Sequence, residues 1–133
     1  MSESTTRKIP APTIAPENRA YWEAAGEGRL LIRHCRACDR LHAYPRALCP
    51  WCFSADTDWV QASGRGTIYS YSIGTGNVPV IPAYVRLDEG ITMLSNMVDC
   101  APEQLHVGLK VSVTFVQADN GQSLPMFRPE GEK

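Results

Sequence analysis

The chain has 133 residues and a formal net charge of −1, with 44% hydrophobic and 20% charged residues. This length allows one modest hydrophobic core with one small additional module. No apolar run approaches the roughly 18–20 residues of a membrane-spanning helix, and the polar first eight residues contain no apolar signal core. We therefore expect a soluble, cytoplasmic protein without membrane contact. The ten prolines and ten glycines favour short β-strands joined by many turns.

Residues 1–28 are predicted to form an arm followed by a short docking helix. The first 16 residues are polar and contain three prolines, which favours an extended chain. A helix is predicted over residues 17–25, because Pro16 precedes it, acidic Glu17 begins it and Gly26 follows it. Tyr21 and Trp22 are its anchors, and they can pack either on this chain or on another subunit.

The next segment, residues 29–62, is predicted to be a zinc ribbon. Residues 29–34 are predicted to form a strand that leads into two Cys-x-x-Cys pairs. The four cysteines are Cys35, Cys38, Cys49 and Cys52. Two such pairs on one short loop place four thiolates where a tetrahedral metal ion needs them. Zinc is the expected metal, with iron as the alternative. A site closed by four sulfurs leaves no position for water or substrate, which indicates a structural role.

Two other interpretations of the cysteines remain open at this stage. Disulfides are disfavoured, since no secretion signal is visible and a reducing compartment is expected. A redox dithiol is disfavoured, since two pairs at ligand spacing favour a closed metal site. His34 and His42 lie beside the pairs and could replace a cysteine, but we expect them to support the ligands or to lie on the surface.

Positive charge is concentrated in the ribbon. Residues 29–52 contain five arginines against Asp39 alone, a net charge of 5 − 1 = +4. Such a patch could meet phosphate on a nucleic acid or on coenzyme A, or an acidic protein surface. The alternative is that these arginines are solvated or bind nearby groups of the ribbon itself.

Residues 63–133 are predicted to form a five-stranded barrel of the OB type. Gly64 and Gly66 mark the hinge, and β-rich segments follow at 67–73, 83–87, 91–98, 110–116 and 124–127. Asn120-Gly121 predicts a hairpin before the last strand. Five short antiparallel strands in about 65 residues fit a small Greek-key barrel better than a sandwich. Residues 74–82 are expected to be a long, extended loop.

Two expectations concern side chains of the barrel. Tyr69, Tyr71 and Ile73 share one face of their strand, and we expect this face to lie in the core. Cys100 is the fifth, unpaired cysteine, and we expect an inert, partly buried thiol. The sequence contains no phosphate loop, Ser/His/Asp order or paired carboxylates at a recognisable spacing, so no self-contained active site is expected.

The order of helix, ribbon and barrel resembles the zinc-ribbon/OB-fold acyl-CoA-associated family, over nearly the whole chain after residue 15. The paired cysteines are the most specific element of the match. The other matching pieces are Trp22, Gly28-Arg29-Leu30, residues 63–70 (SGRGTIYS), Leu87-Asp88-Glu89-Gly90, Gly108 and residues 124–129 (LPMFRP).

The resemblance implies a mainly β protein with a short N-terminal helix, a rubredoxin-like zinc ribbon and an OB-fold barrel. It also implies a non-catalytic accessory subunit, with one zinc ion per chain, that assembles with a thiolase-like or related acyl-CoA-processing enzyme and helps to line the CoA-thioester passage. Our candidates for partner contact are Tyr21, Trp22, Val78, Pro79, Val80 and Ile81. Our candidates for contact with CoA phosphates are the barrel arginines Arg65, Arg86 and Arg128.

A single-stranded nucleic-acid-binding module is the alternative. OB barrels bind single strands by stacking bases on aromatic side chains in a basic groove. Residues 53–133 carry five basic and nine acidic groups, a net charge of 5 − 9 = −4, which is unfavourable for following a phosphate backbone. We therefore expect a protein partner and no nucleic acid.

Overall fold

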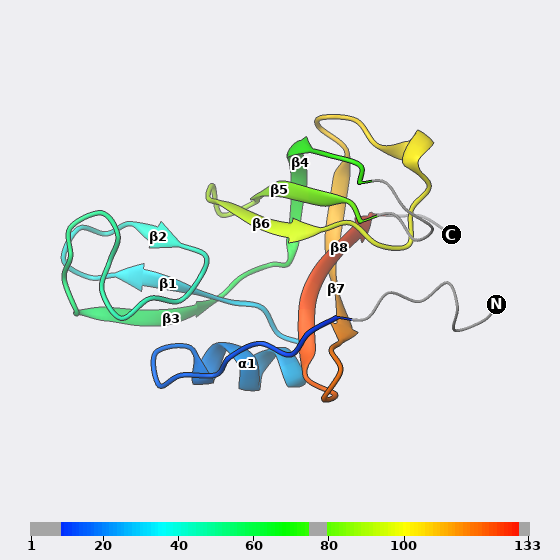
Figure 1. Cartoon of the computed structure of the whole chain (residues 1–133). Helices are drawn as coiled ribbons and strands as arrows, with labels where there is room; N and C mark the ends of the chain where they lie inside the picture. Colours follow the sequence, from blue (N-terminus) through cyan, green and yellow to red (C-terminus); the bar gives the residue numbers. More distant parts are fainter. Residues whose placement is uncertain (1–8, 75–79, 131–133) are drawn as a thin grey trace.

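A computed structural model describes residues 9–74 and 80–130 of the chain and shows one short α-helix beside two antiparallel sheets (Figure 1). Its elements in chain order are α1 (Arg19–Gly26), β1 (Leu31–Cys35), β2 (Leu41–His42), β3 (Thr57–Gln61), β4 (Arg65–Tyr71), β5 (Pro82–Leu87), β6 (Thr92–Asn96), a 3-10 turn at Pro102–Gln104, β7 (Lys110–Gln117) and β8 (Ser123–Pro129). The chain is therefore mainly β, as expected from its turn-rich composition. Within the described residues, no helix is long and apolar enough to cross a membrane.

Helix α1 begins two residues later than the sequence suggests. The side chain of Asn18 accepts a hydrogen bond from the amide of Ala15 at 2.7 Å and fixes the turn before the helix. At the other end Gly28 adopts a left-handed φ of 79°, and its amide donates to the carbonyl of Ala25 at 3.0 Å. This is the arrangement in which glycine commonly ends a helix. The buried residues of the helix are Tyr21, Trp22, Ala24 and Ala25, and they face strands β8 and β1.

The first sheet has three strands in the order β2-β1-β3 and carries the cysteine loops. Strand β1 pairs with β3 over five residues, from Leu31 opposite Gln61 to Cys35 opposite Thr57. The sequence did not predict β3, because none of its residues is fully buried and its pattern lacks a clean alternation. Its position is set by pairing with β1, which is a tertiary effect.

The second sheet has five antiparallel strands in the order β6-β5-β4-β7-β8 and curls on itself. Its two edge strands meet where Met97 forms an isolated bridge with Phe127 and where the hydroxyl of Ser95 donates to the carbonyl of Pro125 at 3.0 Å. All five strands that the sequence predicted for this region are present, which confirms a barrel of the OB type as a small, partly open sheet.

The core lies inside the curled sheet and extends under the helix and the first strand. Ile68, Val85, Val111 and Phe127 are at most 1% exposed, and Ile32 of β1 belongs to the same cluster. The buried face of β1 and the helix therefore share one core with the barrel.

The prediction for the tyrosine face of β4 was wrong. Tyr69, Tyr71 and Ile73 are 57%, 36% and 44% exposed, whereas Ile68 on the opposite face is 1% exposed. The pairing of β4 with β5 shifts register between Ile68 and Ser70. Because successive residues of a strand point to opposite faces, the apolar residues on both faces of β4 left its orientation ambiguous, and the barrel closes on Ile68.

Candidate metal centre

Two turns with the same backbone geometry present the cysteines. In the first, the amide of Asp39 donates to the carbonyl of Cys35 at 2.8 Å; in the second, the amide of Phe53 donates to the carbonyl of Cys49 at 2.8 Å. Asp39 and Phe53 each follow the second cysteine of a pair, and both have a left-handed φ, of 62° and 65°. Each turn therefore directs two sulfur atoms toward one point, and the fold of the ribbon brings these two points together.

The four sulfur atoms lie within 4.8 Å of one another. The Sγ atoms of Cys35 and Cys52 are 3.6 Å apart, and those of Cys38 and Cys49 are 3.7 Å apart. These distances are far longer than a disulfide bond of about 2.05 Å. A tetrahedral zinc ion with Zn–S distances of about 2.3 Å separates its sulfurs by about 3.8 Å. The residues present therefore fit one zinc ion, held by Cys35, Cys38, Cys49 and Cys52.

The electrostatics of the cluster also favour a cation. Burial opposes ionisation of Cys49, but the backbone amides of Cys52 and Trp51 lower the pKa of its thiol to about 7. Burial raises the pKa of Cys38 to about 12, and its neighbouring thiols add to this shift. Four thiolates at this spacing repel one another without a cation between them, so zinc binding would release protons from the cluster.

Cys100 lies outside the cluster and is partly buried against the core. Burial raises the pKa of its thiol, and the carboxylate of Asp99 raises it further. A thiol with a raised pKa is a poor nucleophile at neutral pH.

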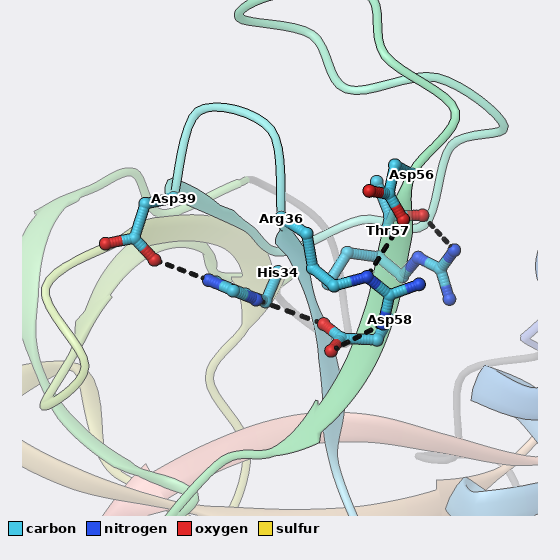
Figure 2. A network of polar contacts seen from close by, with 7 residues as sticks. His34, Arg36, Asp39, Asp56, Thr57 and Asp58 are labelled. Atoms are coloured by element: carbon cyan, nitrogen blue, oxygen red, sulfur yellow. Dashed lines mark hydrogen bonds and ion pairs between the residues drawn. The ribbon is translucent and has the colours of Figure 1, made fainter.

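A network of polar side chains braces the first cysteine turn against β3 (Figure 2). His34 bridges two carboxylates, with Nε2 2.7 Å from Asp39 and Nδ1 3.1 Å from Asp58. These contacts, with Asp39 first, raise the pKa of His34. Arg36 donates to Asp56 at 2.8 Å and to Asp58 at 3.1 Å. His34 is thus positioned to support the turn that holds Cys35, and it is not a ligand in this arrangement.

Replacing Asp58 with asparagine is expected to accelerate zinc release. Asp58 joins His34 and Arg36 across the β1–β3 pair, and it loses both charged contacts in this variant. Exposed ion pairs are weak, so we expect zinc release to a chelator to be about two- to fivefold faster. Asp56→Asn is the matched control, since Asp56 contacts Arg36 alone within the network. Equal release from both variants would show that the contact between Asp58 and His34 has no role in retaining the metal.

Most ribbon arginines are engaged by neighbouring groups, so the positive patch is smaller than its formal charge suggests. Arg29 pairs with Glu27 at 2.6 Å and Arg36 with Asp56. The guanidinium groups of Arg33 and Arg40 lie over the rings of Trp59 and Trp51, at 4.1 and 5.3 Å. Among the described residues, no ion pair or aromatic contact is seen for Arg46.

A cavity of about 600 Å³ separates the ribbon from the open edge of the barrel. The ribbon contributes His42, Tyr44 and Arg46 to its wall, and helix α1 contributes Tyr21 and Trp22. Strands β6 and β8 supply the opposite wall, including Met93, Leu94, Leu124 and Met126. Sequence reasoning missed this site, because its residues come from four separate segments that no local pattern connects.

The candidate contact residues occupy different environments. Tyr21 and Trp22 are 4% and 7% exposed, with their rings edge to face at 4.8 Å, so they pack on this chain. Val80 is partly buried and Ile81 is buried. Val78 and Pro79 lie outside the described residues. Partner contact by these side chains stays a prediction.

The three barrel arginines lie on one outer face of the sheet. Arg65 and Arg128 flank Ser112 across β4, β7 and β8, and Arg86 lies opposite Thr67 on β5. All three are exposed, and the guanidinium of Arg86 lies 5.3 Å from the ring of Tyr69. The strand register thus places the three charges on one surface, and their contact with phosphate stays a prediction.

The fold and the four-sulfur cluster define a zinc-ribbon protein with an OB-fold domain. Residues 22–58 match the family model described as the ChsH2 rubredoxin-like zinc ribbon domain, and residues 59–116 match that of the ChsH2 C-terminal OB-fold domain. The solved structure of the Ltp2-ChsH2(DUF35) aldolase contains a chain with 37% sequence identity and a TM-score of 0.78, covering 90% of this chain and 98% of that chain. The chain belongs to the ChsH2/DUF35 family, and the predicted zinc cofactor is confirmed by the ribbon match together with the sulfur geometry.

Two relatives place the chain within this family. A probable enoyl-CoA hydratase alpha subunit of Thermomonospora curvata is 37% identical over 126 residues, which cover 90% of this chain but 40% of the relative. A DUF35 domain-containing scaffold protein of Methanocaldococcus jannaschii is 28% identical, covering 71% of this chain and 73% of the relative. The chain thus spans about two fifths of the Thermomonospora protein and most of the archaeal one.

Proposed function

We propose that this chain is a non-catalytic accessory subunit, stabilised by zinc, that assembles with an enzyme acting on acyl-CoA thioesters. The observation that carries the proposal is the closed four-sulfur site, because four protein ligands leave no position for a substrate. The similarity to a probable enoyl-CoA hydratase alpha subunit supports the acyl-CoA context, and the similarity to a chain of an aldolase complex supports assembly with an enzyme. The finer proposal is a partner of the thiolase type that forms or cleaves carbon–carbon bonds or transfers acyl groups.

The exposed aromatic face of the barrel is a suitable surface for this partner. Tyr69 and Tyr84 are 57% and 48% exposed, and Leu94, directly opposite Tyr84 in the sheet, is 59% exposed. Exposed apolar groups gathered on one surface often mark protein interfaces, where aromatic side chains contribute much of the binding energy. Val80, which precedes β5 and is partly buried, is a further candidate for this contact. Ile81, Tyr21 and Trp22 are buried, so a partner would reach them only after local rearrangement.

Contact with the CoA phosphates is the second part of the proposal. Arg65, Arg86 and Arg128 share the outer face with Lys110, which lies opposite Thr67. Asp88 and Glu130 line the same region as Arg65 and Lys110 and reduce its charge. We propose that this face borders the thioester passage once the partner is bound.

Native mass spectrometry of the protein, purified gently from its own cells, tests the assembly. We expect a complex with an acyl-CoA enzyme and one zinc ion per chain. Tyr84→Asp is expected to weaken assembly at least tenfold, because a charge placed in a desolvated interface is costly. Phe53→Asp is the matched control: Phe53 is 74% exposed on the ribbon, away from the proposed surface, and Asp tolerates its left-handed φ. Both variants should retain zinc.

Single-stranded nucleic acid remains the second candidate, because the tyrosines expected in the core are exposed. Tyr69 and Tyr84 lie on the barrel surface with Arg86, as base-stacking side chains do in OB-folds. A titration with mixed single-stranded DNA at low salt separates the two functions. Micromolar, salt-sensitive binding that Tyr84→Asp abolishes, together with a monomer in the mass spectrum, would overturn the accessory-subunit proposal.

A further inference from the structure

The cavity between the ribbon and the barrel has the size and lining of a small-molecule site. Its volume of about 600 Å³ lies within the roughly 300–1,000 Å³ that such sites occupy. Tyr21, Met93, Leu124 and Met126 give it apolar walls on both sides. Strands β6 and β8 approach each other at the bridge between Met97 and Phe127 and at the hydrogen bond from Ser95 to Pro125, and residues of both strands line the cavity.

Two side chains in the wall of this cavity carry polar atoms for which the described residues supply no hydrogen-bond partner. They are the indole Nε1 of Trp22 and both ring nitrogens of His42. Each side chain is only 7% exposed. A buried polar atom without a partner costs about 1–3 kcal/mol. Trp22 and His42 both line this cavity, so a ligand that reaches them can complete the hydrogen bonds of the indole N–H and of one imidazole N–H.

The charges and donors around the cavity indicate which chemical groups its ligand carries. The indole N–H of Trp22 can only donate a hydrogen bond. The pKa of His42 is lowered mainly by burial and also by the positive charges of Arg33 and Arg46. A lowered pKa favours the neutral imidazole, which has one N–H donor. Arg46 adds a cation, whereas the other arginines of the cysteine loops have partners within the ribbon. Within residues 9–74 and 80–130, no Asp or Glu lines the cavity. The wall therefore favours a ligand in which a negatively charged hydrogen-bond acceptor is attached to an apolar part.

We propose that this cavity binds an apolar molecule with one carboxylate. The carboxylate would accept hydrogen bonds from Trp22 Nε1 and from a ring nitrogen of His42, and would pair with Arg46. The hydrocarbon part would lie against the methionine and leucine side chains of β6 and β8. Because the nitrogens are covered in this conformation, an exposed rim side chain such as Tyr44 or Arg46 moves aside as the ligand enters.

This inference does not rest on the proposed function, and its test uses the full-length, zinc-loaded chain alone. Decanoate is titrated below its micelle-forming range while the indole N–H signals of the tryptophans are followed by ¹⁵N NMR. We expect saturable binding in the micromolar range, with the Trp22 signal shifting most. Decanol, which has the same chain without the charge, should bind at least tenfold more weakly. No saturable binding below 1 mM, or equal binding of decanol and decanoate, would overturn the proposal.

Two variants connect the binding to the residues in the wall. His42→Phe removes polar atoms that have no partner, so the thermal stability of the chain should stay equal or rise while decanoate affinity falls at least tenfold. Arg46→Gln should lower the affinity about tenfold, whereas Arg40→Gln, which alters an arginine that stacks on Trp51, should leave it unchanged. Unchanged affinity in both His42→Phe and Arg46→Gln would show that decanoate binds elsewhere as an adventitious additive only.

Discussion

Replacing Cys49 with serine is expected to abolish zinc retention and to unfold the ribbon together with the barrel whose core it shares. Cys49 is 0% exposed, and its sulfur lies 3.7 Å from that of Cys38 and accepts a hydrogen bond from the amide of Trp51 at 3.3 Å. Zinc binding contributes about 10–16 kcal/mol to the folding of small zinc modules. This is as large as the roughly 5–15 kcal/mol by which whole domains are stable, so the loss of one ligand is expected to have the largest effect of any substitution in the ribbon.

The measurement is the zinc content per chain together with the dispersion of amide NMR signals from residues 31–61. We expect less than one tenth of a zinc ion per chain and collapse of those signals in Cys49→Ser. Cys100→Ser is the matched control, because Cys100 lies outside the cluster and its loss should leave one zinc ion bound. Retention of one tightly bound zinc ion by Cys49→Ser would contradict the four-cysteine site.

Replacing Gly66 with alanine is expected to destabilise the barrel by about 2–3 kcal/mol. A Cβ atom at this position would overlap the backbone carbonyl oxygen of Arg86 and lie 3.0 Å from the Cα of Leu87. Both obstacles are backbone atoms of the paired strand β5, which cannot rotate away as a side chain could. Strands β4 and β5 must therefore separate locally, at the point where Gly66 pairs with Leu87.

Gly26→Ala is the matched control for this experiment. Gly26 ends helix α1, and an added Cβ meets no atom within 4 Å. Alanine is the better helix former, so this variant should be as stable as the parent or slightly more stable. Urea denaturation of the zinc-loaded chain gives both free energies of unfolding. A loss below about 0.5 kcal/mol in Gly66→Ala would show that β4 and β5 are not held as closely as the structure indicates.

The parts of the molecule that sequence predicts well are those set by local spacing. The two Cys-x-x-Cys pairs define the metal cluster within a few residues of chain, and the alternating apolar residues of β5 and β7 define strands. The curled five-stranded sheet followed from the number and length of such runs.

The features that sequence did not predict depend on contacts between distant segments. Strand β3 forms because β1 supplies a partner, and the tyrosines of β4 face outward because the barrel closes on Ile68. The cavity joins the helix to the ribbon and to strands β6 and β8, so its unpartnered His42 becomes visible only when all of these are placed. The strand register, which a single sequence does not specify, decides each of these features.

The core shared by ribbon and barrel has a consequence for the supply of metal. Leu30 and Ile32 lead into the cysteine loops yet pack with the barrel residues Ile68 and Phe127, and the amide of Ala62 donates to the carbonyl of Leu30 at 2.9 Å. The metal site and the barrel should therefore melt in one cooperative transition. A ligand that binds only the folded state raises the melting temperature by mass action. The amount of intact protein in a cell would then follow the concentration of free zinc, and zinc limitation would deplete the whole chain together with its ribbon.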